Sequence, residues 1–363
     1  MDYIREFDIQ LEREYYYAGE TVVGNVILDT VENFKLRTIR VILRGKAHAE
    51  WKVMLSGDRR TVKDDQFFVD ERQIIWGEKN LETTIPILPR GTHKFPFRFC
   101  LPESSLPCSF ESRQCYIRYF FKVTVDIPYA SPPQGIKYFT VIGPHIDCME
   151  EQYLVNGRRV AGAVKKGTVS LRCVVARSAY VCKESIKLKV TIDNQGEEEV
   201  KLRVKLEQCC EFFIDRGVLG VSKDIKHLVF EYGGCHVKPH SRNKWDSANC
   251  LVIPPLPTTL VHICRLVQIY YLLTVYLDTD KDYDILAVSC PITIGTVPFR
   301  IPNSNSTPAV KYEHACPVVE GGMYLAPEFL LGQVYDGNEH HLREPVVLYK
   351  PVYVAVDKSE NNK

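Results

Sequence analysis

The segment from Leu88 to Phe110 constrains the fold more than any other part of the 363-residue chain. Its sequence, LPRGTHKFPFRFCLPESSLPCSF, has prolines at positions 89, 96, 102 and 107. Because proline has no backbone N–H to donate, most of this segment cannot run through a helix interior or a central strand. Phe95, Phe97 and Phe99 occupy alternate positions, the period of a strand with one buried face. The segment therefore predicts an edge-rich β-sandwich in which three phenyl rings point one way.

Alternating apolar runs bounded by Gly, Pro, Asn and Asp recur along the whole chain, whereas helical periodicity is almost absent. We expect strands at 22–28, 37–43, 95–99, 116–127, 186–192, 201–206 and 269–277. These runs predict an all-β protein.

Two halves of the chain repeat the same order of motifs. The segment 17–28, YAGETVVGNVIL, corresponds to 180–192, YVCKESIKLKVTI, and KVTVDI with a later VIG corresponds to LLTVYLD with a later TIG. A repeated order indicates two tandem modules. We expect a first sandwich at 1–145, a linker or hinge at 146–165, a second sandwich at 166–299 and a tail at 300–363. Pro, Asn and Ser without a sustained period predict a tail that is partly disordered.

Composition and motifs exclude several function classes. The 46 Lys and Arg residues balance 45 Asp and Glu residues, so we expect no nucleic-acid partner. The chain has no Gly-rich phosphate loop, no Gly-x-Ser-x-Gly and no His-Glu-x-x-His, and we expect no enzyme, no catalytic residue and no cofactor. Cysteines with metal-ligand spacing are missing, so no metal site is expected. The acidic run at 278–284 lacks the glycine and distal glutamate of an EF-hand loop and predicts a solvated hairpin tip.

Cysteine usage and hydropathy predict a cytoplasmic protein without a transmembrane segment. The first ten residues, MDYIREFDIQ, lack the apolar core of a signal peptide, so we expect the 13 cysteines to stay reduced and to pack as small apolar residues. The most apolar stretch, 260–277, contains His262, Arg265 and Gln268 and is too short in uncharged length for a bilayer span. It predicts a buried strand.

Several of these motifs resemble one family. LPRGTHKFPFRFCLPE, LPCSFE and IRYFFKVTVDIP in the first half, and LVIPPLP, CRLVQIYYLLTV and CPITIGTVPF in the second, resemble the two sandwiches of arrestin domain-containing proteins, the alpha-arrestins. The resemblance covers roughly 4–299. It implies two immunoglobulin-like arrestin β-sandwiches and a non-enzymatic adaptor in intracellular protein transport. Such an adaptor binds membrane-protein cargo and links it to ubiquitination and endocytic sorting, in the cytoplasm or peripherally at the plasma membrane or endosomes.

A hairpin in the second half is a candidate surface for an anionic partner. Polar and apolar residues alternate on both arms, at 186–192 and 200–206, around a turn at 193–196. One register would place five cations on a single outer face: Lys187, Lys189, Lys201, Arg203 and Lys205. This face predicts contact with acidic cargo, phosphorylated peptide or peripheral anionic lipid. The alternative is a solvated sheet face neutralised by nearby glutamates.

The tail offers two short tyrosine motifs and no ligase motif. Tyr349 with Val352, and Tyr353 with Val356, each fit the sorting pattern of a tyrosine followed three positions later by an apolar residue. An extended tail could add such a strand to an adaptor's sheet edge. The alternative is a β-run at 346–356 that docks back on the body. Alpha-arrestins recruit HECT-type ubiquitin ligases through Pro-Pro-x-Tyr, which this chain lacks. The second interpretation of the chain is therefore a Vps26-like subunit of an endosomal trafficking coat, which shares the paired sandwiches.

Overall fold

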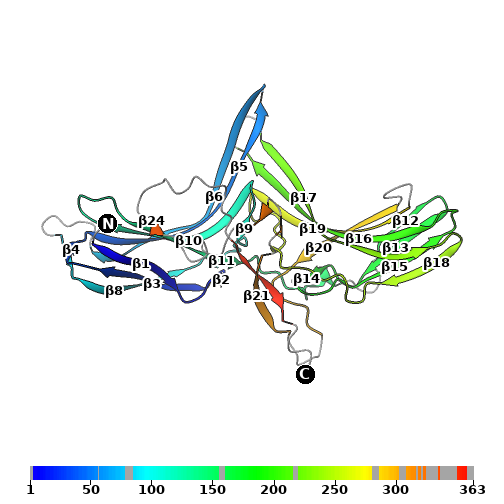
Figure 1. The fold of residues 1–363 in the computed structure, drawn as a ribbon. Coiled ribbons are helices and arrows are strands. Elements are labelled where there is room, and N and C mark those ends of the chain that lie inside the picture. Colours follow the sequence, from blue (N-terminus) through cyan, green and yellow to red (C-terminus); the bar gives the residue numbers. More distant parts are fainter. Residues whose placement is uncertain are drawn as a thin grey trace. The chain divides into compact units, whose positions relative to one another are not determined.

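The computed structural model describes residues 3–55, 57–77, 85–154, 160–215, 220–279, 286–301, 308–315, 318–319, 322–323, 334–335 and 350–357. These residues form two compact units (Figure 1). Unit 1 is built mainly on Met1–Gly143, and unit 2 on Pro144–Phe213, Gly220–Glu320 and Val352–Lys363.

Unit 1 is a sandwich of two sheets. The smaller sheet has the order β1-β3-β8 and consists of β1 (Ile4–Leu11), β3 (Thr21–Thr30) and β8 (Gly91–Cys100). The larger sheet has the order β2-β11-β10-β5-β6 and consists of β2 (Tyr15–Tyr17), β11 (Gln134–Ile142), β10 (Cys115–Asp126), β5 (Thr38–Leu55) and β6 (Asp58–Gly77). Short strands β9 (Phe110–Glu111) and β24 (Val334–Tyr335) pair with β10 and β11, and β4 (Phe34–Lys35) pairs with β7 (Ile87–Leu88).

Aromatic rings from both sheets fill the core of unit 1. Phe95, Phe97 and Phe99 of β8 are 8%, 3% and 5% exposed. The ring of Phe121 on β10 lies 4.9 Å from that of Phe97 and 5.5 Å from that of Phe99. Pro96 lies on β8, which is the edge strand of its sheet, as the missing N–H requires. The predicted edge strand and its three buried rings are confirmed.

Unit 2 repeats the plan. One sheet has the order β12-β13-β15-β18 and consists of β12 (Val160–Lys166), β13 (Val169–Val175), β15 (Leu188–Asn194) and β18 (Ser241–Asp246). The other has the order β14-β20-β19-β16-β17 and consists of β14 (Ala179–Tyr180), β20 (Leu286–Ile294), β19 (Val267–Asp278), β16 (Val200–Ile214) and β17 (Val221–Val237). Strands β21 (Val310–His314) and β25 (Val352–Val356) form a further pair. The shorter β22 (Val318–Val319) and β23 (Gly322–Met323) lie between them in the sequence.

The chain is all-β, with two tandem sandwiches, as predicted. The only helix among the described residues is a single 3-10 turn, η1 (Glu151–Tyr153). No helix in this part of the chain has the length and hydropathy needed to cross a membrane. The described cysteines are free thiols, and nine of these twelve are buried, as expected for small core residues.

Part of the segment predicted as a linker, 146–165, is built into unit 2. The backbone N–H of Ile146 donates to Thr296 Oγ1 at 3.0 Å, and that of Cys148 donates to the Val297 carbonyl at 3.0 Å. Arg300 pairs with Asp147 at 2.5 Å. Further along, β12 begins at Val160 and pairs with β13. A short segment without apolar periodicity can therefore be held in place by backbone hydrogen bonds that cannot be predicted from its sequence.

Candidate partner-binding surfaces

The five cations predicted on one face are divided between two sheets, with Lys187 directly before β15, Lys189 on β15 and the other three on β16. Strand β15 pairs with β13 and β18, whereas β16 pairs with β19 on the opposite sheet of unit 2. The expected hairpin between 186–192 and 200–206 is therefore wrong. The reason is that alternation shows only which residues are buried: Val190 and Val204 are both buried, but their strands belong to different sheets. Alternation correctly indicated which residues are buried but not which strand lies beside which.

Lys201, Arg203 and Lys205 stay together on the outer face of β16, and we call them the β16 strip. Arg203 Nε donates to Asp278 Oδ2 at 2.9 Å, and this hydrogen bond raises the pKa of Arg203. Lys205 Nζ lies 3.5 Å from Glu207 Oε1 and 5.6 Å from the centre of the Tyr276 ring. Arg203 and Lys205 are thus paired with acids of the same sheet.

Lys187 and Lys189 face outward from the other sheet. Lys187 Nζ donates to the Ala248 carbonyl at 2.7 Å and to Asn249 Oδ1 at 2.6 Å. Lys189 is exposed and lies opposite Asp246 of β18 in the ladder. These two lysines cannot share a flat ligand with the β16 strip.

The second tyrosine motif is buried. Val352, Tyr353 and Val356 belong to β25 and are 8%, 3% and 9% exposed, while Tyr349 lies outside the described residues. Strand β25 pairs with β21 along its length, and the Val356 N–H donates to the Cys182 carbonyl at 2.9 Å. This part of the tail docks back on the body, which was the alternative to an extended sorting signal.

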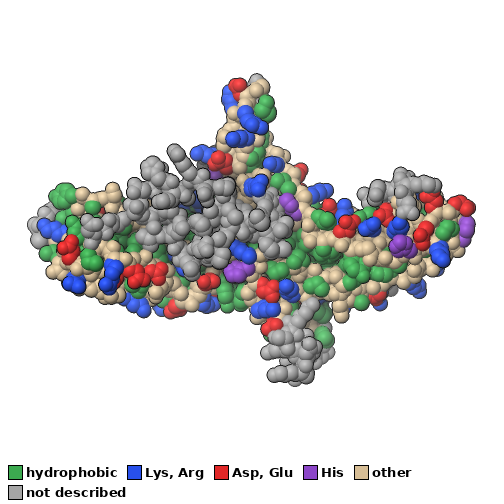
Figure 2. Space-filling model, viewed as in Figure 1, with side chains coloured by type: hydrophobic (Ala, Val, Ile, Leu, Met, Phe, Trp, Pro, Cys, Tyr) green, Lys and Arg blue, Asp and Glu red, His purple; other side chains and the backbone are tan. Residues whose placement is uncertain are grey.

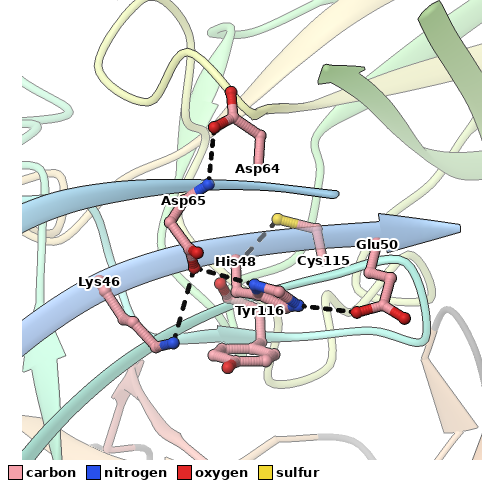
Figure 3. A network of polar contacts seen from close by, with 7 residues as sticks. All are labelled: Lys46, His48, Glu50, Asp64, Asp65, Cys115 and Tyr116. Carbon is pink, nitrogen blue, oxygen red and sulfur yellow. Dashed lines mark hydrogen bonds and ion pairs between the residues drawn. The ribbon is translucent and has the colours of Figure 1, made fainter. Parts of the chain in front are cut away.

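The outer face of the large sheet of unit 1 carries a polar network that the sequence reading missed (Figure 3). Tyr116 of β10, His48 of β5 and Asp65 of β6 lie side by side in the ladder. His48 Nδ1 lies 2.9 Å from Asp65 Oδ1, and Nε2 lies 3.4 Å from Glu50 Oε2. Lys46 Nζ lies 3.6 Å from the same Asp65 oxygen. Burial opposes ionisation of Asp65, but the hydrogen bond from His48 and the charge of Lys46 outweigh it and lower the pKa of Asp65.

Beside this network, a partly buried guanidinium contacts two aromatic rings. Arg118 donates to Glu111 from Nε at 2.5 Å and from Nη2 at 2.8 Å, and the Glu111 side chain is 0% exposed. The guanidinium carbon lies 4.0 Å from the ring centre of Tyr116 and 5.7 Å from that of Tyr138. Burial alone would lower the pKa of Arg118, but the charge and hydrogen bonds of Glu111 raise it. Alternation in 38–55 and 115–126 could have assigned these residues to an outer face, but the network depends on a register that the sequence does not give.

These surfaces are suited to recognition by fixed charges and rings. In the part of the chain that the structure describes, no group of three or more His, Cys, Asp or Glu side chains could hold a metal ion. On the large sheet of unit 1, Arg118, Lys46 and His48 each face an acidic side chain. Such preorganised faces discriminate between partners through charge pattern and shape.

Comparison with known proteins agrees with the paired sandwiches. The family model "Arrestin (or S-antigen), N-terminal domain" matches residues 6–147, and "Arrestin (or S-antigen), C-terminal domain" matches 165–299. Arrestin domain-containing protein 4 of Mus musculus is 25% identical over 296 residues, which cover 78% of this chain and 69% of the relative. The Homo sapiens protein of that name is 26% identical over 297 residues, with the same coverage. Arrestin domain-containing protein 17 of Caenorhabditis elegans is 26% identical over 308 residues, covering 78% and 68%. The chain is a member of the arrestin domain-containing, or alpha-arrestin, family.

Proposed function

We propose that this protein is an adaptor in intracellular protein transport that binds membrane-protein cargo and links it to ubiquitination and endocytic sorting. Family membership supports a general arrestin-like adaptor role. The observation that carries the proposal is the pair of sandwiches, whose cores are apolar and whose outer faces hold ordered charges and rings, such as the Arg118–Glu111 pair. We place the protein in the cytoplasm, peripherally at the plasma membrane or endosomes.

The link to ubiquitination is proposed to run through a partner. The sequence has no Pro-Pro-x-Tyr motif for the WW domains of HECT-type ligases, which favour a preformed polyproline segment. The ligase would then join through another bound protein. Co-purification with a WW-domain ligase that persists after mild salt washing would show direct recruitment instead.

The experiment that tests the adaptor role removes the protein from cells and follows surface proteins. Surface biotinylation with quantitative mass spectrometry should reveal a subset of membrane proteins that leave the surface more slowly. Re-expression of the wild-type chain should restore their turnover. Unchanged surface levels and unchanged turnover of every measured membrane protein would eliminate the adaptor proposal.

The β16 strip is our candidate contact for an acidic cargo segment. An acidic peptide would compete with Asp278 for Arg203, whose side chain is 41% exposed. Changing Lys201, Arg203 and Lys205 together to Glu should weaken capture of the cargo identified above. The matched control changes Lys187 and Lys189 to Glu on the opposite sheet and should leave capture intact. Equal capture by both variants would remove the β16 strip from the proposal.

A further inference from the structure

One end of unit 1 gathers three connecting segments and the residue before β1, and we call it the loop end. It consists of Tyr3 and the segments 31–37, 86–90 and 126–133. The ladders bring these segments together, since they pair Ile4 with Thr30, Thr30 with Gly91 and Thr38 with Asp126. Backbone hydrogen bonds tie the loops to one another, from Val31 N–H to the Tyr3 carbonyl at 3.0 Å, from Leu36 N–H to Pro86 at 3.0 Å and from Arg37 N–H to Asp126 at 2.8 Å.

The loop end exposes an unusual share of the large apolar side chains of unit 1. Tyr129 is 102% exposed, Ile87 59%, Tyr3 43% and Val31 40%. Among the described residues of 1–143, three other large apolar side chains are comparably exposed, and they lie on the β5–β6 hairpin. Single exposed apolar residues are ordinary, whereas several on loops that are hydrogen-bonded to one another make the loop end a candidate interaction site.

Tyr129 occupies a turn position, directly after Pro128, that usually carries Gly or Asn because its φ is positive. It lies in the turn between β10 and β11 with φ of 61°, a left-handed value that is uncommon for a bulky residue. The Ala130 N–H reaches the Ile127 carbonyl at 3.4 Å, and prolines at 128, 132 and 133 restrict the turn on both sides. The ring is fully exposed, so packing against the rest of the chain does not offset the energetic cost of this backbone conformation. Strain held in place by a rigid loop is typical of functional positions.

Cations outnumber the exposed acids beside these apolar tips, where Glu32 is exposed in the segment 31–37. Lys35 is exposed and lies opposite Ile87 in the β4–β7 ladder, and exposed Arg90 follows two residues after β7. Arg37 is 45% exposed and pairs with Asp126 at 3.5 Å. Figure 2 shows hydrophobic, Lys or Arg, and Asp or Glu side chains next to one another at the end of unit 1 that carries β4. Long basic side chains can extend toward a charged surface while their stems cover apolar groups.

We propose that the loop end docks on the surface of an anionic lipid bilayer, with the Tyr129 ring inserted at the headgroup level. A bilayer fits better than a folded partner because the apolar groups protrude on turns, where a soft medium can receive them without a matching pocket. Tyrosine favours the interface since its ring is apolar and its hydroxyl is polar. Lys35 and Arg90 add attraction to acidic headgroups. This inference goes beyond cargo linkage and needs no cargo.

The test measures binding of the purified full chain to phosphatidylcholine vesicles with and without phosphatidylserine. Tyr129→Asn removes the ring but keeps a residue that tolerates the left-handed turn. We expect this variant to bind phosphatidylserine vesicles about tenfold more weakly, or about 1.4 kcal/mol. Leu228→Asn is the matched control, since Leu228 is 57% exposed on β17 of unit 2, and it should bind as the wild type does.

A site-specific readout separates the loop end from other lipid contacts. The indole introduced by Tyr129→Trp should be quenched by brominated lipid in the vesicles, whereas an indole introduced by Leu228→Trp should not. Three results would overturn the proposal: no vesicle binding by the wild type, equal binding by Tyr129→Asn, or no quenching at position 129. Concentration-dependent self-association that Tyr129→Asn abolishes would also overturn it and assign the loop end to a second copy of the chain. None of these results affects the interpretation of the surface-turnover experiment. The lipid-docking proposal and the adaptor proposal can therefore be refuted independently of each other.

Discussion

At the residue scale, the Arg118–Glu111 pair is the most constrained polar contact of unit 1. Arg118 lies on the outward-facing side of β10, where alternation would place solvated residues, yet the side chain of its partner Glu111, on the adjacent strand β9, is fully buried. Two hydrogen bonds and two aromatic rings surround the guanidinium. Desolvation makes a buried pair only weakly favourable as a whole, but loss of one partner leaves an uncompensated buried charge.

Single and double changes at this pair should therefore have unequal costs. We expect Glu111→Gln or Arg118→Met alone to lower the free energy of unfolding by about 3–5 kcal/mol. The double variant should cost less than the sum of the two, because no buried charge remains. Urea denaturation measures all three. Asp70→Asn is the control, since the Arg44–Asp70 pair at 3.2 Å is partly exposed and should contribute about 0–1 kcal/mol. Single changes as mild as the control would contradict the prediction.

The lowered pKa of Asp65 predicts a contribution to acid stability. A carboxyl whose folded pKa lies below its unfolded value stabilises the fold above the unfolded pKa, and this contribution is lost as pH falls through the folded pKa. The window is below about pH 4, the ordinary range of an aspartate. Asp65→Asn should therefore make the free energy of unfolding depend less steeply on pH in this window. Near neutral pH, the pH dependence of the free energy of unfolding should be unchanged. Denaturation midpoints across acidic pH test this, and an unchanged acid slope would contradict it.

Residue burial was predictable from the sequence wherever a strict alternation ran through it. Phe95, Phe97 and Phe99 were assigned to the core, and they lie there. The His48–Asp65 contact was not predictable, because it joins residues 17 apart through the register of a long hairpin. A β-bulge between Gly45 and Lys46 shifts that register, and no local signal in the sequence marks the shift.

At the scale of elements, the strands were more predictable than their neighbours. The expected strand at 116–127 corresponds to β10, and those at 201–206 and 269–277 lie within β16 and β19. The prediction of a hairpin between 186–192 and 200–206 was wrong because each strand has one apolar, buried face in either arrangement. A short connection between two such strands can turn back within one sheet or cross to the opposite sheet. The choice is made by long-range partners, here β18 and β19.

Strand β25 should protect the residues beneath it. Ala355 is 0% exposed and bridges to Cys182, whose burial raises the pKa of its thiol to about 12. A chain truncated before Val352 should expose this thiol, and alkylation of Cys182 should become about tenfold faster or more, because protection then depends on local opening. Mass spectrometry after timed alkylation measures the rate at each cysteine.

The internal control for this prediction is Cys173. It is also 0% exposed in unit 2, and burial likewise raises the pKa of its thiol to about 12. Its alkylation should stay slow in the truncated chain. If Cys182 remained as protected as Cys173, β25 would not be the element that covers it.

At the scale of the whole molecule, the two units share details as well as a plan. In unit 1, β2 runs parallel to β11, and the Tyr119 hydroxyl donates to the Pro107 carbonyl at 2.9 Å. In unit 2, β14 runs parallel to β20, and the Tyr271 hydroxyl donates to the Pro257 carbonyl at 2.6 Å. The repeated order of motifs predicted two tandem sandwiches, but it predicted neither these parallel strand pairs nor these hydrogen bonds.

Because each unit has its own core, we expect core substitutions to act on separate unfolding transitions. Phe121 of unit 1 and Leu273 of unit 2 are both 0% exposed. Phe121→Ala and Leu273→Ala should each cost about 2–5 kcal/mol from lost contacts and a cavity. Scanning calorimetry should show each variant lowering the midpoint of a different transition. A single transition that both variants shift together would contradict the expectation.

The shared tyrosine-to-proline hydrogen bond has an evolutionary consequence. A gene that arose by duplication inherits two copies of the same internal scaffold, and the constraints that maintain one copy also maintain the other. Exterior residues are under no such common restraint, so each copy can drift toward its own ligand. One ancestral module can in this way have supplied a single polypeptide with two independently evolving specificities.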